Sequence, residues 1–242
     1  MPQEKLHTVS ACWDGLSLTI SSRQPISGIA DLSDKTGHLL ISIKNRAFDK
    51  TLIRGFCRFV TEHMRDGYIT VVDAPYLHNV EAVTPEGEER KRKADAVMRL
   101  AAERTRQVEK ILQGYADAPL SLLPWRDLVA DVPGWIGEEV DAAYARNGVF
   151  RAAIAEQCRK MLPGFDEAAE PLAFERFLLE EIPPLLYAYY LLEGGVADFY
   201  PGPIGEVFWD IDFGRLTDEL PRVTELAQAH EGFVYVEFHA AG

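Results

Sequence analysis

A strand–helix–strand unit between residues 37 and 75 constrains the fold more than any other feature of this sequence. The apolar runs GHLLISI (37–43) and DGYITVVDAP (66–75) predict two buried strands. Between them, NRAFDKTLIRGFCRFVTEHM (45–64) has apolar residues at helical spacing. Because such units place their strands in parallel with a right-handed crossover, we expect an α/β fold with a Rossmann-like, mostly parallel sheet flanked by helices.

Further elements are predicted on both sides of this unit: a strand at 16–20, a short strand and turn at 119–128, a helix at 133–162 broken near 147–148, a helix at 171–182, a loop at 199–209 and a strand at 230–239. The helix at 171–182 is expected to end before Pro183 and Pro184, because a proline disfavours helix in the preceding residue. Segment 1–37 is predicted to be an N-terminal extension packed on the main domain. The length favours a single domain over 1–242.

The turn after the first predicted strand, SIKNR (42–46), contains no glycine. A glycine-rich loop lets backbone amides cradle a nucleotide pyrophosphate, so nicotinamide and ATP binding are disfavoured here. The sequence has no GxSxG elbow, which disfavours an α/β-hydrolase. Its six histidines form no HExxH pair, and its three cysteines are scattered without CxxC spacing. We therefore expect no cofactor and no metal ion.

Charge is distributed unevenly along the chain. The net charge of −13 argues against a generic nucleic-acid binder, which usually has a basic balance. Residues 90–110, however, contain eight Lys or Arg and three Asp or Glu. On a helical wheel, one face of this segment carries Arg92, Arg99, Arg106 and Lys110. The segment is either a solvated helix surface or a contact for several phosphates, and its residues alone leave both interpretations open.

Three separate residues are candidates for chemistry. Ser42 ends the first predicted strand, and ligands of parallel α/β sheets bind beyond the carboxyl ends of the strands. Glu181 lies one turn after Phe177, so the two share a helix face. Tyr200 precedes a rigid proline. Taken singly, each is better explained by a structural role: Ser42 as a turn or helix N-terminal hydroxyl, Glu181 as a solvated acid and Tyr200 as a loop anchor.

Taken together and in order, these features resemble the cyclodipeptide synthases, which make cyclic dipeptides from two aminoacyl-tRNAs. The resemblance runs from about His38 to His239. It rests on an ordered set of motifs: LLISIKN, ITVVD, the basic segment, FLLEE, Tyr200–Pro201 and the final GFVYVEF. The fold that this resemblance implies is that of a class I tyrosyl- or tryptophanyl-tRNA synthetase catalytic domain without ATP binding.

The resemblance also implies a mechanism. Ser42 would be the nucleophile that takes an aminoacyl group from the first tRNA as an ester, in covalent, ping-pong catalysis. Glu181 would hold the substrate ammonium and take part in proton transfer, and Tyr200 would support Ser42 or relay protons. Asn45 would orient the loop around the nucleophile. The product would be a diketopiperazine, formed when the dipeptidyl-enzyme cyclises.

The binding residues implied by the resemblance form two groups. The amino-acid pockets would involve Leu40, Thr70, Trp135 and Phe177. The tRNA acceptor stem would be held through its phosphates by the basic segment: Arg90, Lys91, Arg92, Lys93, Arg99, Arg106 and Lys110. An RNA substrate held by one helix is compatible with an acidic protein, whereas DNA binding is not expected.

Two departures from the family pattern leave other functions open. Phe177 stands where the family has a tyrosine, and Trp135 stands where a second pocket tyrosine is expected. A phenyl ring cannot donate the hydrogen bond of a tyrosine hydroxyl. The alternatives are an aminoacyl transferase with another acceptor and a non-catalytic tRNA-binding relative. The sequence shows no long apolar run and no secretory signal, so we expect a cytoplasmic protein without membrane contact; its oligomeric state is left open, with a monomer compatible.

Overall fold

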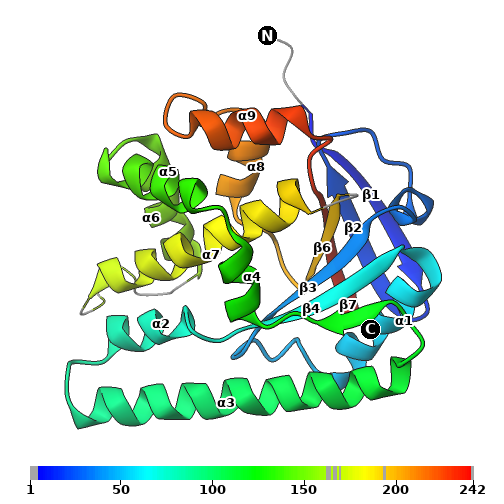
Figure 1. Cartoon of the computed structure of the whole chain (residues 1–242), viewed down its shortest axis with the longest axis horizontal. Helices are drawn as coiled ribbons and strands as arrows, with labels where there is room; N and C mark the ends of the chain where they lie inside the picture. The colour runs from blue at the N-terminus through cyan, green and yellow to red at the C-terminus, as the bar shows by residue number, and fades with distance from the viewer. Residues whose placement is uncertain (1–4, 162–164, 166–167, 169, 193–194, 241–242) are drawn as a thin grey trace.

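The computed structural model describes residues 5–161, 165, 168, 170–192 and 195–240. At its centre lies a seven-stranded sheet in the order β1-β2-β7-β6-β3-β4-β5, with helices packed on both faces (Figure 1). The strands are β1 (His7–Trp13), β2 (Leu16–Ser22), β3 (Thr36–Ser42), β4 (Asp66–Val72), β5 (Leu120–Leu122), β6 (Val196–Tyr200) and β7 (Val234–Ala240). The helices are α1 (Lys50–His63), α2 (Tyr76–Val83), α3 (Glu88–Leu112), α4 (Trp125–Asp131), α5 (Gly134–Ala145), α6 (Val149–Met161), α7 (Pro171–Leu191), α8 (Glu206–Asp212) and α9 (Pro221–Ala229). No helix within these described ranges is long and apolar enough to cross a bilayer.

The predicted strand–helix–strand unit is confirmed as β3, α1 and β4. β3 and β4 pair in parallel over seven residue pairs, the last of which joins Ser42 to Val72. β6 lies parallel on the other side of β3, and β7 lies parallel to β6. The predicted α/β fold with a mostly parallel sheet is therefore confirmed. The carboxyl ends of β3 and β6 lie at one edge of this sheet, where Ser42 and Tyr200 are the last strand residues.

Two glycines allow α1 to lie close to the sheet. A Cβ atom on Gly37 of β3 would lie 2.8 Å from Val60 Cγ2, and one on Gly67 of β4 would lie 2.9 Å from Val60 Cγ1. Side-chain carbons do not approach so closely, because interiors are already packed to crystal-like density. Glycine at these two positions therefore sets the distance between α1 and the two strands that carry the candidate site.

α1 begins later than predicted, at Lys50 instead of residue 45. Asp49 is its N-cap, with a side-chain oxygen that accepts the backbone N–H three residues later at 2.8 Å. The preceding residues form turns, and the Asn45 N–H donates to the Ser42 carbonyl at 3.1 Å. As a result Asn45 stays beside the end of β3.

The N-terminal segment contributes more to the sheet than an extension would. The strand predicted at 16–20 is confirmed as β2, and β1, a strand that was not predicted, pairs with it as an antiparallel hairpin. β2 in turn pairs antiparallel with β7 over seven residue pairs. Leu16, Leu18 and Ile20 of β2 are buried in the core beneath α1. The two strands of this hairpin are therefore part of the central sheet.

The prediction that helix 171–182 ends before Pro183 and Pro184 is wrong, because α7 continues through both prolines to Leu191. Each proline removes one backbone hydrogen bond from the helix, at a cost of about 3 kcal/mol or more in an isolated helix interior. The second half of α7 is held by its tertiary contacts. The Tyr189 hydroxyl donates to Asp198 at 2.9 Å, and the Tyr190 hydroxyl donates to Asp212 at 3.0 Å.

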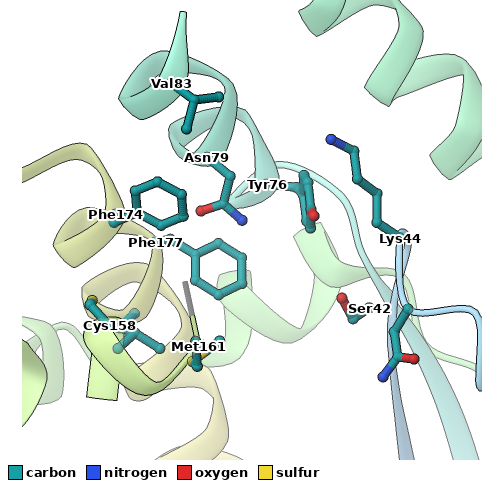
Figure 2. A pocket seen from close by; sticks show the side chains of 11 residues that line it. Ser42, Lys44, Tyr76, Asn79, Val83, Cys158, Met161, Phe174 and Phe177 are labelled. Carbon is teal, nitrogen blue, oxygen red and sulfur yellow. The ribbon is translucent and has the colours of Figure 1, made fainter. Parts of the chain in front are cut away.

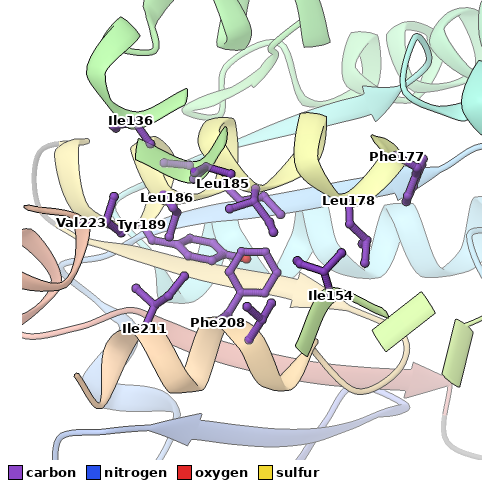
Figure 3. Close-up of a cluster of buried hydrophobic side chains, with 14 of the residues drawn as sticks. Ile136, Ile154, Phe177, Leu178, Leu185, Leu186, Tyr189, Phe208, Ile211 and Val223 are labelled. Carbon is purple, nitrogen blue, oxygen red and sulfur yellow. The ribbon is translucent and has the colours of Figure 1, made fainter. Parts of the chain in front are cut away.

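Successive side chains of β3 point to opposite faces of the sheet and enter two different cores. Leu39 and Ile41 belong to the core beneath α1 and α3, whereas Leu40 belongs to the core beneath α7. This second core is built around the apolar face of α7, including Leu178, Leu185, Leu186 and Tyr189, with Phe208 and Ile211 of α8 (Figure 3). The alternation places the Ser42 side chain on the same face as Leu40, toward α7.

Candidate active site

Two cavities meet at Ser42, at the carboxyl end of β3. The inner cavity has a volume of about 160 Å³ and lies between the sheet, α7 and α8. The outer cleft has a volume of about 400 Å³ and lies between the end of β3, α2 and α7 (Figure 2). Four residues line both: Ser42, Met161, Phe177 and Leu178. A group bonded to the Ser42 hydroxyl can therefore face either space.

Tyr200 is held beside Ser42 by three contacts. Its hydroxyl accepts a hydrogen bond from Asn45 Nδ2 at 3.3 Å and makes a side-chain hydrogen bond with Ser42. Its ring packs edge-on against Phe48, with centroids 5.3 Å apart. Asn45 Oδ1 accepts the Ala47 backbone N–H at 2.9 Å, which fixes the amide with Nδ2 toward Tyr200. Since Asn45 is a donor here, the proton of the Tyr200 hydroxyl is left for Ser42 or a ligand.

The Tyr200 hydroxyl keeps its proton across the physiological range. Burial raises the pKa of this hydroxyl, and the hydrogen bond with Asn45 lowers it in part. The hydroxyl is therefore a hydrogen-bond donor and a proton relay, because it cannot persist as a phenolate at neutral pH.

Glu181 lines the inner cavity from α7. Burial raises the pKa of this carboxyl to about 8, and the negative charge of Asp198 adds to the rise. A carboxyl with this pKa is mostly protonated at neutral pH and can both donate and accept a proton. A cationic group entering the cavity would favour its ionised form, because an opposite charge within a few ångströms stabilises a carboxylate.

A row of polar side chains crosses the sheet beneath Glu181. His38, Tyr68 and Asp198 are neighbours in register on β3, β4 and β6, and Tyr235 of β7 continues the row. His38 Nδ1 lies 3.0 Å from Asp198 Oδ1, and both residues are buried. Asp198 also lines the inner cavity. The sequence analysis missed Asp198; the spacing of Asp198 and Tyr200 by two residues would have placed them on one face had β6 been recognised as a strand.

The outer cleft has polar groups on one wall and apolar groups on the other. Tyr76 and Asn79 of α2 line it together with Lys44, which lies two residues after Ser42. The Tyr76 ring meets the Phe177 ring edge-on, with centroids 6.1 Å apart. Lys44, Tyr76 and Asn79 were not selected from the sequence, because no spacing rule connects the start of α2 to the end of β3.

The predicted pocket residues are divided by the structure. Leu40 lines the inner cavity, and Phe177 lines both cavities. Thr70 lies in register with Leu40 but is fully buried and lines neither space. Trp135 lies on α5, and the Arg222 guanidinium carbon lies 4.3 Å from the centroid of the Trp135 ring. Trp135 also lines neither the inner cavity nor the outer cleft. The structure therefore does not bring Thr70 and Trp135 to the cavities at Ser42.

The basic segment forms α3, a helix of 25 residues that runs along one side of the molecule (Figure 1). Its exposed cations are Lys91, Arg92, Lys93, Arg99, Arg106 and Lys110. Lys93 pairs with Glu89 at 2.9 Å, and Arg90 is partly buried and pairs with Glu170. Two of the seven predicted tRNA-binding side chains thus have internal partners.

One further arginine of α3 connects the helix to the site. Arg104 Nη1 donates to the Phe48 carbonyl at 2.8 Å, in the loop that follows Ser42. The same Phe48 supports Tyr200 through its ring. The basic helix is therefore fixed to the loop that shapes the end of β3. Among the residues with described positions, no group of three or more His, Cys, Asp or Glu is arranged to hold a metal ion.

The sequence matches no family model and no curated protein, but the fold has solved counterparts. A Mycobacterium tuberculosis protein, whose structure demonstrates that cyclodipeptide synthetases are related to type I tRNA synthetases, has a TM-score of 0.68 at 14% identity over 96% of each chain. A cyclodipeptide synthase from Bacillus thermoamylovorans has a TM-score of 0.67 at 14% identity, covering 88% of this chain and 92% of that one.

A third counterpart was solved with RNA. This cyclodipeptide synthase from Candidatus Glomeribacter gigasporarum, bound to Phe-tRNAPhe, has a TM-score of 0.54 at 15% identity, covering 85% of this chain and 88% of that one. Identities near 15% establish a shared fold, whereas function has to be argued from the site. The chain therefore has the fold of the cyclodipeptide synthases, the family that its ordered motifs resemble.

Proposed function

We propose that this protein is a cyclodipeptide synthase that uses two aminoacyl-tRNAs and forms an aminoacyl-enzyme on Ser42. The observation that carries the proposal is the position of Ser42, which lines both the inner cavity and the outer cleft. A reaction that joins two aminoacyl groups at one nucleophile needs two spaces beside it. An enzyme with one substrate would need only one.

In the first step, the Ser42 hydroxyl attacks the ester carbonyl of an aminoacyl-tRNA. The bond to the tRNA ribose oxygen breaks, and that oxygen receives the proton given up by Ser42. Tyr200 is placed to relay this proton because its hydroxyl is hydrogen-bonded with Ser42. One ester replaces another, so the step needs no ATP, in agreement with the absence of a glycine-rich loop after the first strand.

In the second step, the amine of the Ser42-bound aminoacyl group attacks the carbonyl of a second aminoacyl-tRNA and releases its tRNA. The free amine of the resulting dipeptidyl group then attacks the Ser42 ester, which closes the ring and regenerates the serine hydroxyl. Each attack requires an amine to lose a proton. Glu181 lines the cavity in which the first aminoacyl group would lie, and it would bind the ammonium and accept that proton in its ionised form.

A second candidate function is aminoacyl transfer to an acceptor other than a second aminoacyl-tRNA. The observation that favours it is Phe177, a buried phenyl ring that lines both cavities. This ring shapes the passage between the two spaces but donates no hydrogen bond to an amino group. The acyl-enzyme on Ser42 would be the same, and only the second substrate would differ.

The experiment that tests the proposal is incubation with each aminoacyl-tRNA carrying a labelled amino acid, followed by detection of labelled protein and of diketopiperazine. Wild type is expected to carry one label per chain and to release a cyclic product, whereas Ser42→Ala should do neither. Ser121→Ala, which changes an exposed serine on β5, is the control.

Each other outcome of this experiment has a defined meaning. Labelled protein without a cyclic product would replace the proposal with the second candidate. Binding of tRNA without labelled protein would identify a non-catalytic tRNA-binding protein. Equal behaviour of wild type and Ser42→Ala with all twenty amino acids would reject Ser42 as the nucleophile.

A further inference from the structure

Lys44 is a cation without a local counter-charge at the mouth of the outer cleft. Its side chain is exposed, and no carboxylate of the described residues forms an ion pair with it, although the chain has 38 acidic residues against 25 basic ones. Its Nζ instead lies 5.0 Å from the centroid of the Tyr76 ring. Lys44, Tyr76 and Ser42 all line the same cleft (Figure 2).

The contact with Tyr76 gives the Lys44 ammonium a defined place. A cation over an aromatic face is attracted by the ring quadrupole, which contributes about 0.5–1 kcal/mol at exposed sites. This contact leaves the three N–H donors of the ammonium without an anionic acceptor. A lysine ammonium is a compact point charge and a common phosphate ligand in proteins. The cleft therefore offers an anion a positive charge on the same wall as the Ser42 hydroxyl.

Lys44 and Ser42 are close enough along the chain to contact one nucleotide. Ser42 ends β3, and Lys44 follows it in a turn that is closed by the hydrogen bond from the Asn45 N–H to the Ser42 carbonyl at 3.1 Å. In a nucleotide acylated on its 3′-oxygen, six bonds separate the acyl carbon from the 5′-phosphorus, a span of at most about 7 Å. A nucleotide whose ester lies at Ser42 therefore has its 5′-phosphate within reach of a long side chain in this turn.

We propose that Lys44 binds the 5′-phosphate of the nucleotide that carries the aminoacyl group, with Tyr76 holding the ammonium in place. The inference rests on the proposed function, because it takes the ester of an aminoacyl-tRNA to be the group that Ser42 attacks. Lys44 is a binding residue in this scheme: it fixes the ester carbonyl at Ser42 and takes no part in proton transfer. It belongs to the outer cleft and is separate from the cations of α3.

The test compares three donors of one aminoacyl group: the aminoacyl-tRNA, the 3′-aminoacyl ester of adenosine 5′-monophosphate, and the 3′-aminoacyl ester of adenosine. For Lys44→Met, single-turnover acylation of Ser42 should show an approximately 10-fold higher half-saturation concentration with the two phosphate-bearing donors, and an unchanged maximal rate. The adenosine ester should react equally with wild type and variant. Lys44→Arg should retain most of the affinity, and Lys50→Met, an exposed lysine on α1, should behave as wild type.

Two results would overturn the inference. Equal losses with all three donors would mean that Lys44 acts on the structure of the cleft and not on a phosphate. No loss with any donor would mean that Lys44 does not bind the substrate.

A binding measurement separates this inference from the proposed function. Calorimetry would use non-reactive 3′-aminoacylamide analogues of adenosine, with and without the 5′-phosphate. If wild type forms no acyl-enzyme but binds the phosphorylated analogue at least 10-fold more tightly than the other, and Lys44→Met loses that preference, the proposed function fails and the phosphate site stands. If neither protein distinguishes the two analogues, the phosphate site is rejected whatever the acylation result.

Discussion

Glu181 holds a proton at a pH at which an exposed glutamate has lost it. Burial and the charge of Asp198 raise the pKa of this carboxyl to about 8, whereas the pKa of an unfolded glutamate is about 4.3. Between these two values the folded protein binds one more proton than the unfolded chain. The free energy of unfolding therefore falls as pH rises through this window, and it is highest below the unfolded pKa.

The Glu181→Gln variant should lack this pH dependence, because an amide does not titrate. The melting temperatures of both proteins would be measured from pH 5 to pH 9. Between these pH values, the melting temperature of wild type should fall by about 4 °C or more relative to that of Glu181→Gln, since roughly 2–4 °C corresponds to 1 kcal/mol in a chain of this size. Glu138→Gln, on an exposed position of α5, is the control and should follow wild type. Parallel melting curves for wild type and Glu181→Gln would contradict the raised pKa.

Several residues that lie together in the candidate site could be selected from the sequence, and the others were missed for identifiable reasons. Ser42, Asn45 and Tyr200 come together because they lie at the ends of neighbouring strands. Trp135 was predicted to lie in a pocket because the family resemblance implies a tyrosine at this position, but its actual position depends on how α5 packs beside Arg222 on α9. Asp198 was missed because β6 is short and part of it was predicted to be a loop.

At the scale of elements, α1 packs closely on β3 and β4, the two strands whose ends carry or adjoin the candidate site. Gly67→Ala would place a carbon 2.9 Å from Val60 and 3.0 Å from the Gly37 carbonyl. Because a backbone atom is one of the two neighbours, the strand cannot relieve the overlap by rotating a side chain. We expect this substitution to lower the free energy of unfolding by about 1–3 kcal/mol, the usual cost of overpacking a core.

Gly137→Ala on α5 is a matched control for this prediction. A Cβ atom at Gly137 would meet nothing within 4 Å, and alanine is favoured over glycine in a helix by up to about 1 kcal/mol. In urea unfolding, the free energy of unfolding should therefore fall for Gly67→Ala, whereas it should rise or stay the same for Gly137→Ala. Equal effects would mean that the close approach of Val60 to Gly67 does not limit the packing of α1.

Local sequence rules predicted the elements well where packing agrees with them. The strand–helix–strand unit has both the right periodicity and the right burial, so its prediction held apart from the start of α1. α7 differs because proline disfavours the helix locally while the buried tyrosines after it bind Asp198 and Asp212. β1 was missed because its residues alternate between partly buried and exposed and include no apolar run.

For the whole molecule, the distribution of charge determines where a polyanion such as tRNA can bind. The net charge of −13 disfavours RNA binding on most of the surface, whereas α3, which carries six exposed cations, runs along one side of the molecule (Figure 1). Such a distribution orients a polyanion as it approaches, and it does so less effectively as salt screens the charges. A tRNA held along α3 would be positioned by the same helix that donates to the Phe48 carbonyl beside the site.

Charge reversal on α3 tests this arrangement. Changing Arg92, Arg99 and Arg106 together to glutamate should weaken tRNA binding by more than 10-fold at low salt. It should also reduce the slope of log affinity against log salt by about 2–3, since each phosphate contact contributes about 0.7–0.9. A triple variant at exposed cations on other helices, Lys50, Arg54 and Arg126, carries the same change in charge and should bind as wild type apart from a small general effect. Unchanged affinity of the α3 variant would reject this helix as the tRNA contact.

The position of β7 in the sheet has a consequence for how the molecule is made. β7 is the last strand of the chain, yet it lies between the N-terminal hairpin and β6. During synthesis the β1–β2 hairpin leaves the ribosome more than 200 residues before its permanent neighbour, with the backbone groups along one edge of β2 unpaired. Pairings this distant in sequence form slowly and expose that edge to other chains in the meantime. We therefore expect the nascent chain to keep this edge of β2 unpaired until β7 has been synthesised and can complete the sheet.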